Sequence, residues 1–150
     1  MRTPRFIIDG TNVVLLHGRA SPELRYLLAL CDCLRSRQET FVCYFDANTE
    51  YLLEAQSPGQ AEVFQQLIRV PPWSRDLHVV PGGVEADELI LRSAKAAGAD
   101  VVSNDKFRDR ARQHRWIWKR RHPLVATRET LILATLGLEI PVLPAAVDYL

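Results

Sequence analysis

Acidic side chains stand at the ends of three expected structural elements. Asp9 ends a short apolar run, Asp87 lies in the Glu-Ala-Asp-Glu segment that opens a helical pattern, and Asp105 follows a second apolar run. In an open α/β sheet, ligands bind in the crevice beyond the carboxyl ends of the strands. Asp9 and Asp105 are therefore expected where such a sheet does its chemistry. Three carboxylates from separate parts of the chain predict a divalent-metal site.

Asp109 adds a fourth carboxylate if a helix follows Asp105, because residues four apart stack on one helical face. Two carboxylates about 4 Å apart repel each other by roughly 4 kcal/mol at an effective dielectric constant near 20. Several such pairs would rival the whole stability of a domain, which is about 5–15 kcal/mol. Either the groups lie apart, or some hold protons, or a cation holds them together. No Cys or His stands at metal-ligand spacing, so Mg²⁺ or Mn²⁺ fits best.

Each carboxylate also has a structural explanation. Asp105 could cap a helix that starts at Lys106, with Asp109 in its first turn. The acidic residues of segment 85–88 could do the same for the helix that begins there. Asp46 ends another apolar run, and we expect it at the periphery of the site. The metal-site interpretation therefore depends on the carboxylates acting together.

Basic residues are concentrated after the last acidic run. The net charge is only +1, yet 8 of the 19 Lys and Arg residues lie between Lys106 and Arg121, opposed there by Asp109 alone. Such a local field favours an anionic partner, although a solvated basic face is the simpler interpretation. Trp116 and Trp118 lie in this stretch and could stack on unpaired bases or pack partly into the core. We expect the phosphates of a nucleic acid to bind Arg108, Arg112, Arg115, Lys119 and Arg120.

The elements that position these residues follow from the apolar pattern. Short runs rich in Val, Ile or Phe predict buried strands over Arg5–Asp9, Thr40–Asp46, Leu77–Val80 and Ala99–Ser103. Helical stripes predict helices from Pro22 to Gln38, with Ser21 as cap, and over Gly59–Val70 and Glu85–Ala97. Gly98 is a suitable residue to end the last of these. Alternating strands and helices predict an α/β fold with a mostly parallel sheet.

Two further segments are less regular. The tail segments Thr130–Leu136 and Glu139–Leu143 are separated by Gly-Leu, which is typical of a closing hairpin or a pair of edge strands. Residues 73–76 come after two prolines and are expected to form a loop that could flank a binding cleft.

Length and composition are those of an ordinary globular chain. The 150 residues fit a single domain over residues 1–150, with 47% hydrophobic and 25% charged residues. Cys31 and Cys33 lie two apart on an expected helix and cannot easily bridge, so the three cysteines are expected to be reduced thiols. With no signal-peptide pattern and no apolar run of membrane-spanning length, we expect a cytoplasmic protein without a membrane partner.

These residues resemble a known family, the NYN branch of the PIN-like nucleases, and within it the Regnase-type, zinc-finger-associated ribonuclease domain. The resemblance covers most of the chain. Its most specific part is the run Ser-Asn-Asp-Lys-Phe-Arg-Asp at 103–109, beside Ile-Asp-Gly-Thr-Asn at 8–12. Further matching segments are His-Gly at 17–18, Ala-Asp-Glu-Leu-Ile at 86–90, and 118–119, 131–136 and 140–141.

The resemblance implies a three-layer α/β/α fold and Mg²⁺-dependent endonucleolytic cleavage of RNA, with self-association in some relatives. Asp9, Asp87, Asp105 and Asp109 fall on the family's acidic positions, and Asn12 falls on its polar position beside the first Asp. The chain departs from the pattern at Ala86, where the family has the first of two adjacent Asp residues. Glu85 or Glu88 could substitute for it. The zinc finger that often accompanies such domains is not found within these residues.

The sequence therefore predicts a metal-dependent endoribonuclease that acts on single-stranded or loop RNA. Asp9, Asp87 and Asp105 would hold Mg²⁺ or Mn²⁺, Asp109 would act as an outer ligand or position the water, and Asn12 would orient a carboxylate or contact a phosphate. One alternative is an RNA-binding module that has too few ligands for catalysis. Another is a metal-dependent phosphatase or nucleotidase, although an Asp-x-Asp pair is missing at the first strand.

Overall fold

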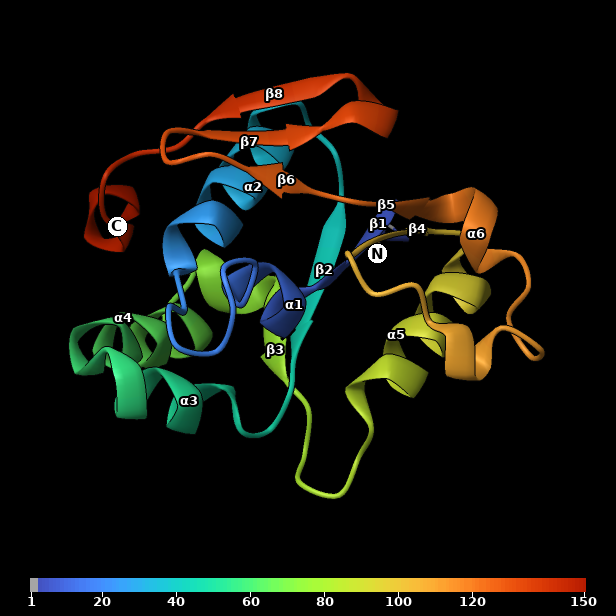
Figure 1. The fold of residues 1–150 in the computed structure, drawn as a ribbon, viewed down its shortest axis with the longest axis horizontal. Coiled ribbons are helices and arrows are strands. Elements are labelled where there is room, and N and C mark those ends of the chain that lie inside the picture. The colour runs from blue at the N-terminus through green and yellow to red at the C-terminus, as the bar shows by residue number, and fades with distance from the viewer. Residues whose placement is uncertain (1–2) are drawn as a thin grey trace.

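A parallel sheet forms the centre of the molecule. The computed structural model describes residues 3–150, and its main sheet has five strands in the order β3-β2-β1-β4-β5 (Figure 1). Every neighbouring pair is parallel. Four of the strands confirm the sequence prediction with slightly shorter bounds, and the two-residue strand β5 was not predicted. The strands are β1 (Phe6–Asp9), β2 (Phe41–Phe45), β3 (Leu77–Val79), β4 (Asp100–Val102) and β5 (Arg121–His122).

Helices cover both faces of this sheet and make it the middle of three layers. Along β1, Phe6 and Ile8 point to one face and Ile7 to the other, as alternation in a strand requires. Phe6 and Ile8 pack with α1, α2 and α4, whereas Ile7 packs with α5 and the buried Ile117 of α6. The predicted α/β fold is thus confirmed. The helices are α1 (Gly10–Val14), α2 (Leu24–Ser36), α3 (Thr49–Gln56), α4 (Pro58–Arg69), α5 (Ala86–Ala97) and α6 (Ile117–Arg120).

The helix ends differ in part from the sequence prediction. Helix α5 ends at Gly98, whose backbone has a φ of 65°, so this prediction is confirmed. Helix α2 starts at Leu24, and the extended Glu23 precedes it without a side-chain cap, so the predicted start at Pro22 with Ser21 as cap is wrong. Helix α3 was not predicted. Residues 73–76, expected as a loop, contain the short 3₁₀ turn η1 (Trp73–Arg75).

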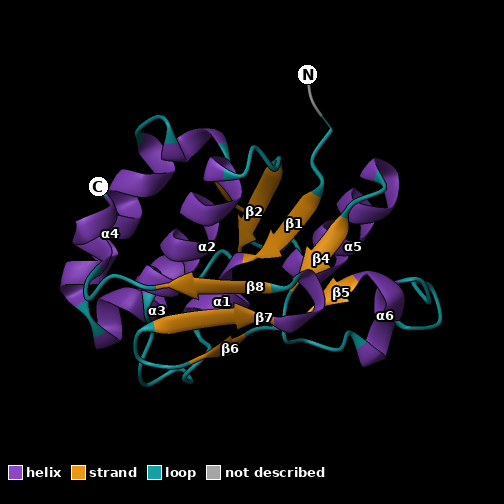
Figure 2. Ribbon diagram, turned by 90° about the horizontal axis from the view of Figure 1, so that it is seen from above, coloured by secondary structure: helices purple, strands orange, loops and turns teal. Residues whose placement is uncertain are grey.

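A second, smaller sheet lies against α2. It is antiparallel with the order β6-β7-β8, and its strands are β6 (Val125–Ala126), β7 (Thr130–Leu133) and β8 (Leu138–Pro141). The predicted hairpin is therefore present as β7 and β8, and β6 extends it (Figure 2). Leu131, Leu133 and Ile140 are buried in the same cluster as the leucines of α2. The 3₁₀ turns η3 (Ala134–Leu136) and η4 (Ala146–Tyr149) complete this region.

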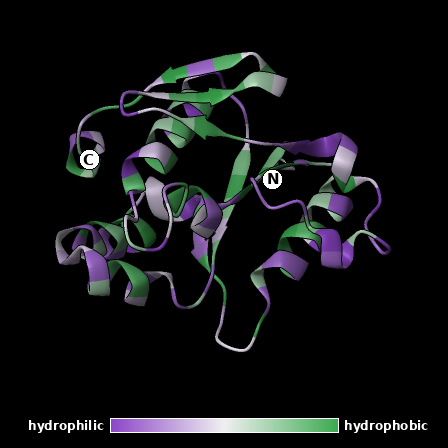
Figure 3. Ribbon diagram, in the orientation of Figure 1, coloured by the Kyte–Doolittle hydropathy of each residue, from purple (hydrophilic) through white to green (hydrophobic). Residues whose placement is uncertain are grey.

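Hydropathy matches this architecture. Hydrophobic residues gather on the strands and the inner sides of the helices, whereas the segment between α5 and β5 is largely hydrophilic (Figure 3). Cys31, Cys33 and Cys43 are all free thiols, as expected. In the chain from residue 3 to residue 150, none of the helices has the length and apolar character needed to cross a membrane.

Gly10 allows the first strand to turn directly into α1 against β2. A Cβ atom at this position would lie 2.6 Å from Cys43 Sγ and 2.7 Å from Cδ1 of Phe45, closer than real contacts allow. Both neighbours are fully buried, so neither side chain can move away easily. Only glycine fits this position without repacking of the sheet.

We predict that Gly10→Ala lowers the free energy of unfolding by about 1–3 kcal/mol, because the added methyl group overpacks the core. The measurement is urea denaturation monitored by circular dichroism. Gly59→Ala is the matched control, since Gly59 lies in α4 with open space around it. That change should be neutral or stabilise the helix by up to about 1 kcal/mol. Equal stability of the two variants would contradict the close packing at Gly10.

Candidate functional site

The carboxyl ends of three adjacent strands bring acidic residues to one edge of the sheet. Asp9 is the last residue of β1, the central strand, and only 5% of its surface is exposed. Asp46 comes directly after the neighbouring strand β2 on one side, and Ser103 and Asp105 come after β4 on the other. Asp87 lies in the first turn of α5, which packs against β1 and β4. The sequence prediction that these segments converge on one edge is consistent with this arrangement.

Hydrogen bonds fix the position of Asp9. The Ser103 hydroxyl donates to Oδ2 of Asp9 at 2.8 Å, and the backbone N–H of Asp105 donates to the Ser103 hydroxyl oxygen at 3.0 Å. Ser103 is fully buried, so this chain of bonds is shielded from solvent. It connects the ends of β1 and β4 through their side chains as well as through the sheet.

The segment after Asp105 is not the helix that the sequence predicted. Oδ1 of Asp105 accepts the backbone N–H of Phe107 at 2.7 Å, which makes a local turn. Phe107 has a φ of 51° and is buried in the core, so the chain cannot continue as an α-helix there. The chain instead forms the single 3₁₀ turn η2 (Arg108–Arg110). The predicted helix from Lys106 is therefore wrong, and with it the argument that Asp105 and Asp109 stack on a helical face.

The electrostatic state of the carboxylates shows that they act on one another. Burial raises the pKa of Asp9 to about 7; the Ser103 hydrogen bond opposes this shift, and the charges of Asp87, Asp46 and Asp105 add to it. Burial also raises the pKa of Asp87 to about 6, and the charge of Asp105 contributes while Arg110 opposes the rise. We call Asp9, Asp46, Asp87 and Asp105 the acidic group.

Asp46 belongs to this group more closely than the sequence suggested. It was expected at the periphery, yet its charge raises the pKa of both Asp9 and Asp87. Its backbone N–H donates to the Thr11 hydroxyl at 2.8 Å, which holds the start of the loop beside α1. Its own pKa is raised, chiefly by partial burial. The signal for Asp46 in the sequence was its place at the end of an apolar run, the same signal that identified Asp9.

The spacing within the acidic group is wider than direct coordination requires. Among residues 3–150, no three His, Cys, Asp or Glu side chains lie close enough to enclose a metal ion. The donor chemistry nevertheless suits a hard cation, because the converging side chains offer only carboxylate oxygens. Mg²⁺ usually retains several waters in proteins and needs few direct protein ligands. A cation bound here would therefore have fewer than three direct ligands from these side chains, and water would complete its coordination shell.

Glu85 and Glu88 are engaged elsewhere. Both form ion pairs with Arg110 of η2, and the distance from Oε2 of Glu88 to Nη1 of Arg110 is 2.9 Å. Glu88 also pairs with Arg92 one helical turn later, at 3.0 Å. Ala86, where the resembling family has an Asp, is buried. Both glutamate side chains are therefore directed toward Arg110, although the charge of Glu85 still helps to raise the pKa of Asp87.

The side chain of Asn12 forms a hydrogen bond with the backbone and not with a carboxylate. Its side-chain oxygen accepts the backbone N–H of Asn104 at 2.9 Å. The side chain of Asn104 in turn binds both the N–H and the carbonyl of Leu124, at 2.7 and 2.9 Å. Asn12 thus connects α1 to the loop that carries Ser103 and Asp105. In the described chain, no contact or charge effect links Asp109 to the acidic group, and its side chain is exposed.

The basic stretch divides into exposed and engaged residues. Arg120 is half-buried, pairs with Asp100 at 3.3 Å and also donates to the Ala99 carbonyl, so it is not available as a phosphate ligand in the way the sequence predicted. Trp116 packs partly into the core with the Arg120 guanidinium 4.9 Å from its ring centre, whereas 61% of Trp118 is exposed. The exposed members of the predicted phosphate face are Arg108, Arg112, Arg115 and Lys119.

Sequence reasoning did not single out Ser103 and Arg121. Nη1 of Arg121, from the unpredicted strand β5, donates to the Ser103 carbonyl at 3.1 Å, directly behind the residue that binds Asp9. Ser103 lies in the Ser-Asn-Asp run that ends a predicted strand, which was the available signal. For Arg121 the only signal in the sequence was its place in the basic stretch, because a strand of two residues has no recognisable apolar pattern.

Comparisons with known proteins identify a family and a fold. The family model described as "Zc3h12a-like Ribonuclease NYN domain" matches residues 3–127. A comparison with curated protein sequences gave no match. The described fold is similar to two solved structures of the nuclear protein-only RNase P 2 from Arabidopsis thaliana, each with a TM-score of 0.65 and 17% identity.

These structural matches concern the fold. They cover 87% and 96% of this chain but only 29% and 31% of the Arabidopsis chains. The chain therefore spans less than a third of the length of these neighbours. At this level of identity, the likeness supports the α/β architecture and leaves residue roles to be argued from the site itself.

The raised pKa of Asp9 predicts a pH-dependent cost to stability. A carboxyl group whose pKa is higher in the folded than in the unfolded state destabilises the folded state when it is ionised. The free energy of unfolding therefore falls as the pH rises from about 4 to about 7, and it stays low above that. A rise from 3.8 to about 7 corresponds to on the order of 4 kcal/mol. Asp9→Asn should therefore be more stable than the unchanged protein at pH 8 in EDTA, and this gain should shrink at pH 5.

Urea denaturation at both pH values checks this prediction. Asp109→Asn serves as the control, because it makes the same chemical change at an exposed position outside the acidic group. It should give no comparable gain at pH 8. If Asp9→Asn were destabilised equally at both pH values, the carboxylate would be a satisfied structural group rather than a buried charge without compensation.

Proposed function

Because the chain belongs to the Zc3h12a-like ribonuclease NYN domain family, we propose that it is an endoribonuclease that uses Mg²⁺ or Mn²⁺ to hydrolyse single-stranded or loop RNA. The observation that carries the proposal is the acidic group at the carboxyl edge of the parallel sheet. Burial raises the pKa of both Asp9 and Asp87, and the charges of the neighbouring carboxylates raise it further. A dication is the simplest partner for such a group.

Asp9, Asp87 and Asp105 would hold the cation. The charge of Asp46 acts on Asp9 and Asp87, so it would also attract the cation. When bound, the cation would neutralise charge that develops on the phosphodiester and activate the attacking water. The Ser103 hydroxyl fixes the Asp9 carboxylate, and the Asp105 amide fixes Ser103. These bonds set the orientation of Asp9 before any ligand arrives, as a preorganised site requires.

The departure at Ala86 has a consequence for the ligand set. Because Arg110 pairs with both Glu85 and Glu88, we infer that neither glutamate replaces the missing carboxylate while these ion pairs are intact. Asp46 is the better candidate, because its charge raises the pKa of both Asp9 and Asp87, whereas Glu85 is paired with Arg110 and raises only that of Asp87. Asp109 falls on an acidic position of the family, and its role as outer ligand or water-positioner stays a prediction without support from a helix.

The exposed basic residues would bind the RNA backbone. Arg108, Arg112 and Arg115 lie on the segment that leaves the acidic edge, and the chain then continues to Lys119. Phosphates bound there would lead the strand toward Asp105. The exposed Trp118 offers a face on which an unpaired base can stack, which favours single-stranded or loop RNA over duplex.

One observation favours a second candidate, a non-catalytic RNA-binding module. Within the described part of the chain, no three potential ligands reach direct metal spacing, and Ala86 removes one acidic position. Such a module would bind RNA without Mg²⁺ and would not cut it under Mn²⁺. RNA cleavage in the presence of a dication therefore separates the two functions.

We predict that the protein cuts a labelled single-stranded RNA in Mg²⁺ or Mn²⁺ and that EDTA stops the reaction. Asp105→Asn should reduce the cleavage rate by about 100-fold or more, because it removes a charged ligand and leaves the backbone unchanged. Gel analysis of end-labelled products under single-turnover conditions measures the rate. Glu54→Gln, at an exposed position of α3, is the control and should cut at the unchanged rate. An Asp105→Asn variant that cuts as fast as the original would refute its role.

A separate prediction concerns the basic residues. Arg115→Ala should weaken RNA binding in EDTA and reduce the slope of log Kd against log salt by about 0.7, the value for one phosphate contact on a single strand. Arg69→Ala removes the same charge from α4 and should leave the slope unchanged. Fluorescence anisotropy at several salt concentrations gives both slopes. Identical slopes for the two variants would exclude Arg115 from the phosphate-binding face.

A further inference from the structure

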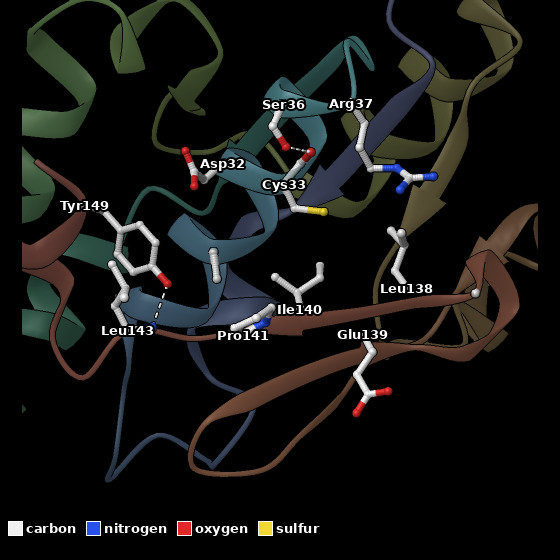
Figure 4. A pocket seen from close by; sticks show the side chains of 12 residues that line it. Asp32, Cys33, Ser36, Arg37, Leu138, Glu139, Ile140, Pro141, Leu143 and Tyr149 are labelled. Carbon is white, nitrogen blue, oxygen red and sulfur yellow. Dashed lines mark hydrogen bonds between the residues drawn. The ribbon is translucent and has the colours of Figure 1, made fainter.

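The two faces of the central sheet differ in how completely helices cover them. On one face the strands pack with α1, α2 and α4, and a groove of about 480 Å³ opens between α2 and β8 rather than onto these strands (Figure 4). On the other face, α5 packs mainly against β1 and β4, and β2 and β3 lie to its side (Figure 1). Burial along the strands agrees, because all four residues of β1 are buried, whereas β2 alternates between buried and half-buried residues. The α5 face is therefore open over β2 and β3.

Three side chains form a row on this α5 face. The pairing of β1 with β2 puts Asp9 opposite Tyr44, and the pairing of β2 with β3 puts Tyr44 opposite His78. Residues opposite each other in adjacent strands direct their side chains to the same face. Asp9 shares its face with Ile7, which packs with α5, because side chains alternate along a strand. The row therefore begins at the buried carboxylate of the acidic group and ends on β3, the last strand of the sheet.

The rings of Tyr44 and His78 give this row an aromatic surface. Their ring centres are 6.2 Å apart and the ring planes are tilted by 42°. Tyr44 is half-buried and packs on one side against the same cluster as α5, whereas His78 is exposed. Aromatic pairs across strands help to hold a sheet together. That role does not require exposure to solvent, so the exposed ring surface is available to a ligand.

The place of the two rings in the sheet indicates which ligand they bind. Tyr44 and His78 lie on the β2–β3 side of Asp9, whereas the basic stretch and the exposed Trp118 follow β4 on the other side. An RNA strand with a phosphodiester at the acidic group and further phosphates on the basic stretch would continue from Asp9 toward β2 and β3. Aromatic rings bind unpaired bases by stacking, with little dependence on which base it is. An unpaired base of that strand is therefore the ligand that fits these rings.

We propose that Tyr44 and His78 form a stacking site for one unpaired base of the RNA, next to the phosphodiester at the acidic group. The strand then crosses the carboxyl edge of the sheet, with the basic stretch on one side of Asp9 and the stacked base on the other. Duplex RNA is excluded from the site, because its bases are already paired and stacked on one another. The inference rests on the proposed function for its substrate class, RNA, but it does not require cleavage, because stacking needs no cation.

Binding of RNA with and without its bases tests this site. Fluorescence anisotropy in EDTA measures Kd for a short single-stranded RNA and for a strand of the same length in which every base is absent. Tyr44→Leu removes the ring and keeps an apolar side chain, and it should weaken binding of the RNA by at least about 5-fold. Binding of the abasic strand should not change, because the phosphate contacts remain. Tyr44→Phe keeps the ring and should bind both strands as the original protein does.

Tyr51→Leu is the matched control. It makes the same change at a ring that is 75% exposed on α3, and α3 packs with α4 on the opposite face of the sheet. Both affinities should stay unchanged in this variant. A second measurement uses RNA that carries 5-iodouridine, which forms photocrosslinks with aromatic side chains that it contacts. Mass spectrometry of the crosslinked peptides should locate the modification at Tyr44 or His78.

The outcomes separate the stacking site from the nuclease function. The proposal fails if Tyr44→Leu weakens binding of both strands equally, since the change would then act on the fold or on the phosphate contacts. Crosslinks to Trp118 with none to Tyr44 or His78 would also overturn it, even if the protein cuts RNA in Mg²⁺. A protein that gives the expected crosslinks and base-dependent affinity but cuts no RNA would support the stacking site and refute the nuclease function. Binding of neither strand would refute both.

Discussion

One buried carboxylate at the end of the central strand is the main constraint on the acidic edge of the sheet. Asp9 lies beside the carboxyl ends of the two neighbouring strands, β2 and β4. The hydroxyl of Ser103, which follows β4, donates a hydrogen bond to its carboxylate. Burial makes its negative charge unfavourable, and the nearby carboxylates increase that effect. Fold and function therefore oppose each other at this residue, because the packing that orients the carboxylate also destabilises its ionised form. Such local conflict is typical of functional sites.

The strand order explains why residues distant in sequence share this site. With β1 between β2 and β4, Asp46 and Asp105 approach Asp9 from opposite sides. Gly10 makes this possible, because the chain turns into α1 directly against Cys43 and Phe45 of β2. The acidic group is thus a product of sheet topology as much as of residue choice.

Most of the central sheet could be predicted from the sequence, because β1 to β4 are apolar runs with a clear pattern. Helix α5 was also predictable, since Gly98 ends it with a positive φ. The failures have physical causes. Asp105 bonds to its own backbone and the buried Phe107 adopts a left-handed conformation, so a segment with good helical composition becomes a turn. The engagement of Arg120 with Asp100 and the paired state of Glu85 and Glu88 are tertiary contacts that composition does not encode.

The basic segment is fastened at both of its ends by ion pairs. Arg110 forms an ion pair with Glu88 near the start of α5, and Arg120 forms one with Asp100 at the start of β4. The exposed cations Arg112, Arg115 and Lys119 lie between these two ion pairs. Dissolved salt screens these ion pairs as well as the attraction between cations and phosphates. A rise in ionic strength therefore weakens two kinds of interaction, the contacts with phosphate and the two ion pairs. The buried Ile117 between the two ion pairs keeps the middle of the segment packed on the core, so salt acts mainly on its exposed residues.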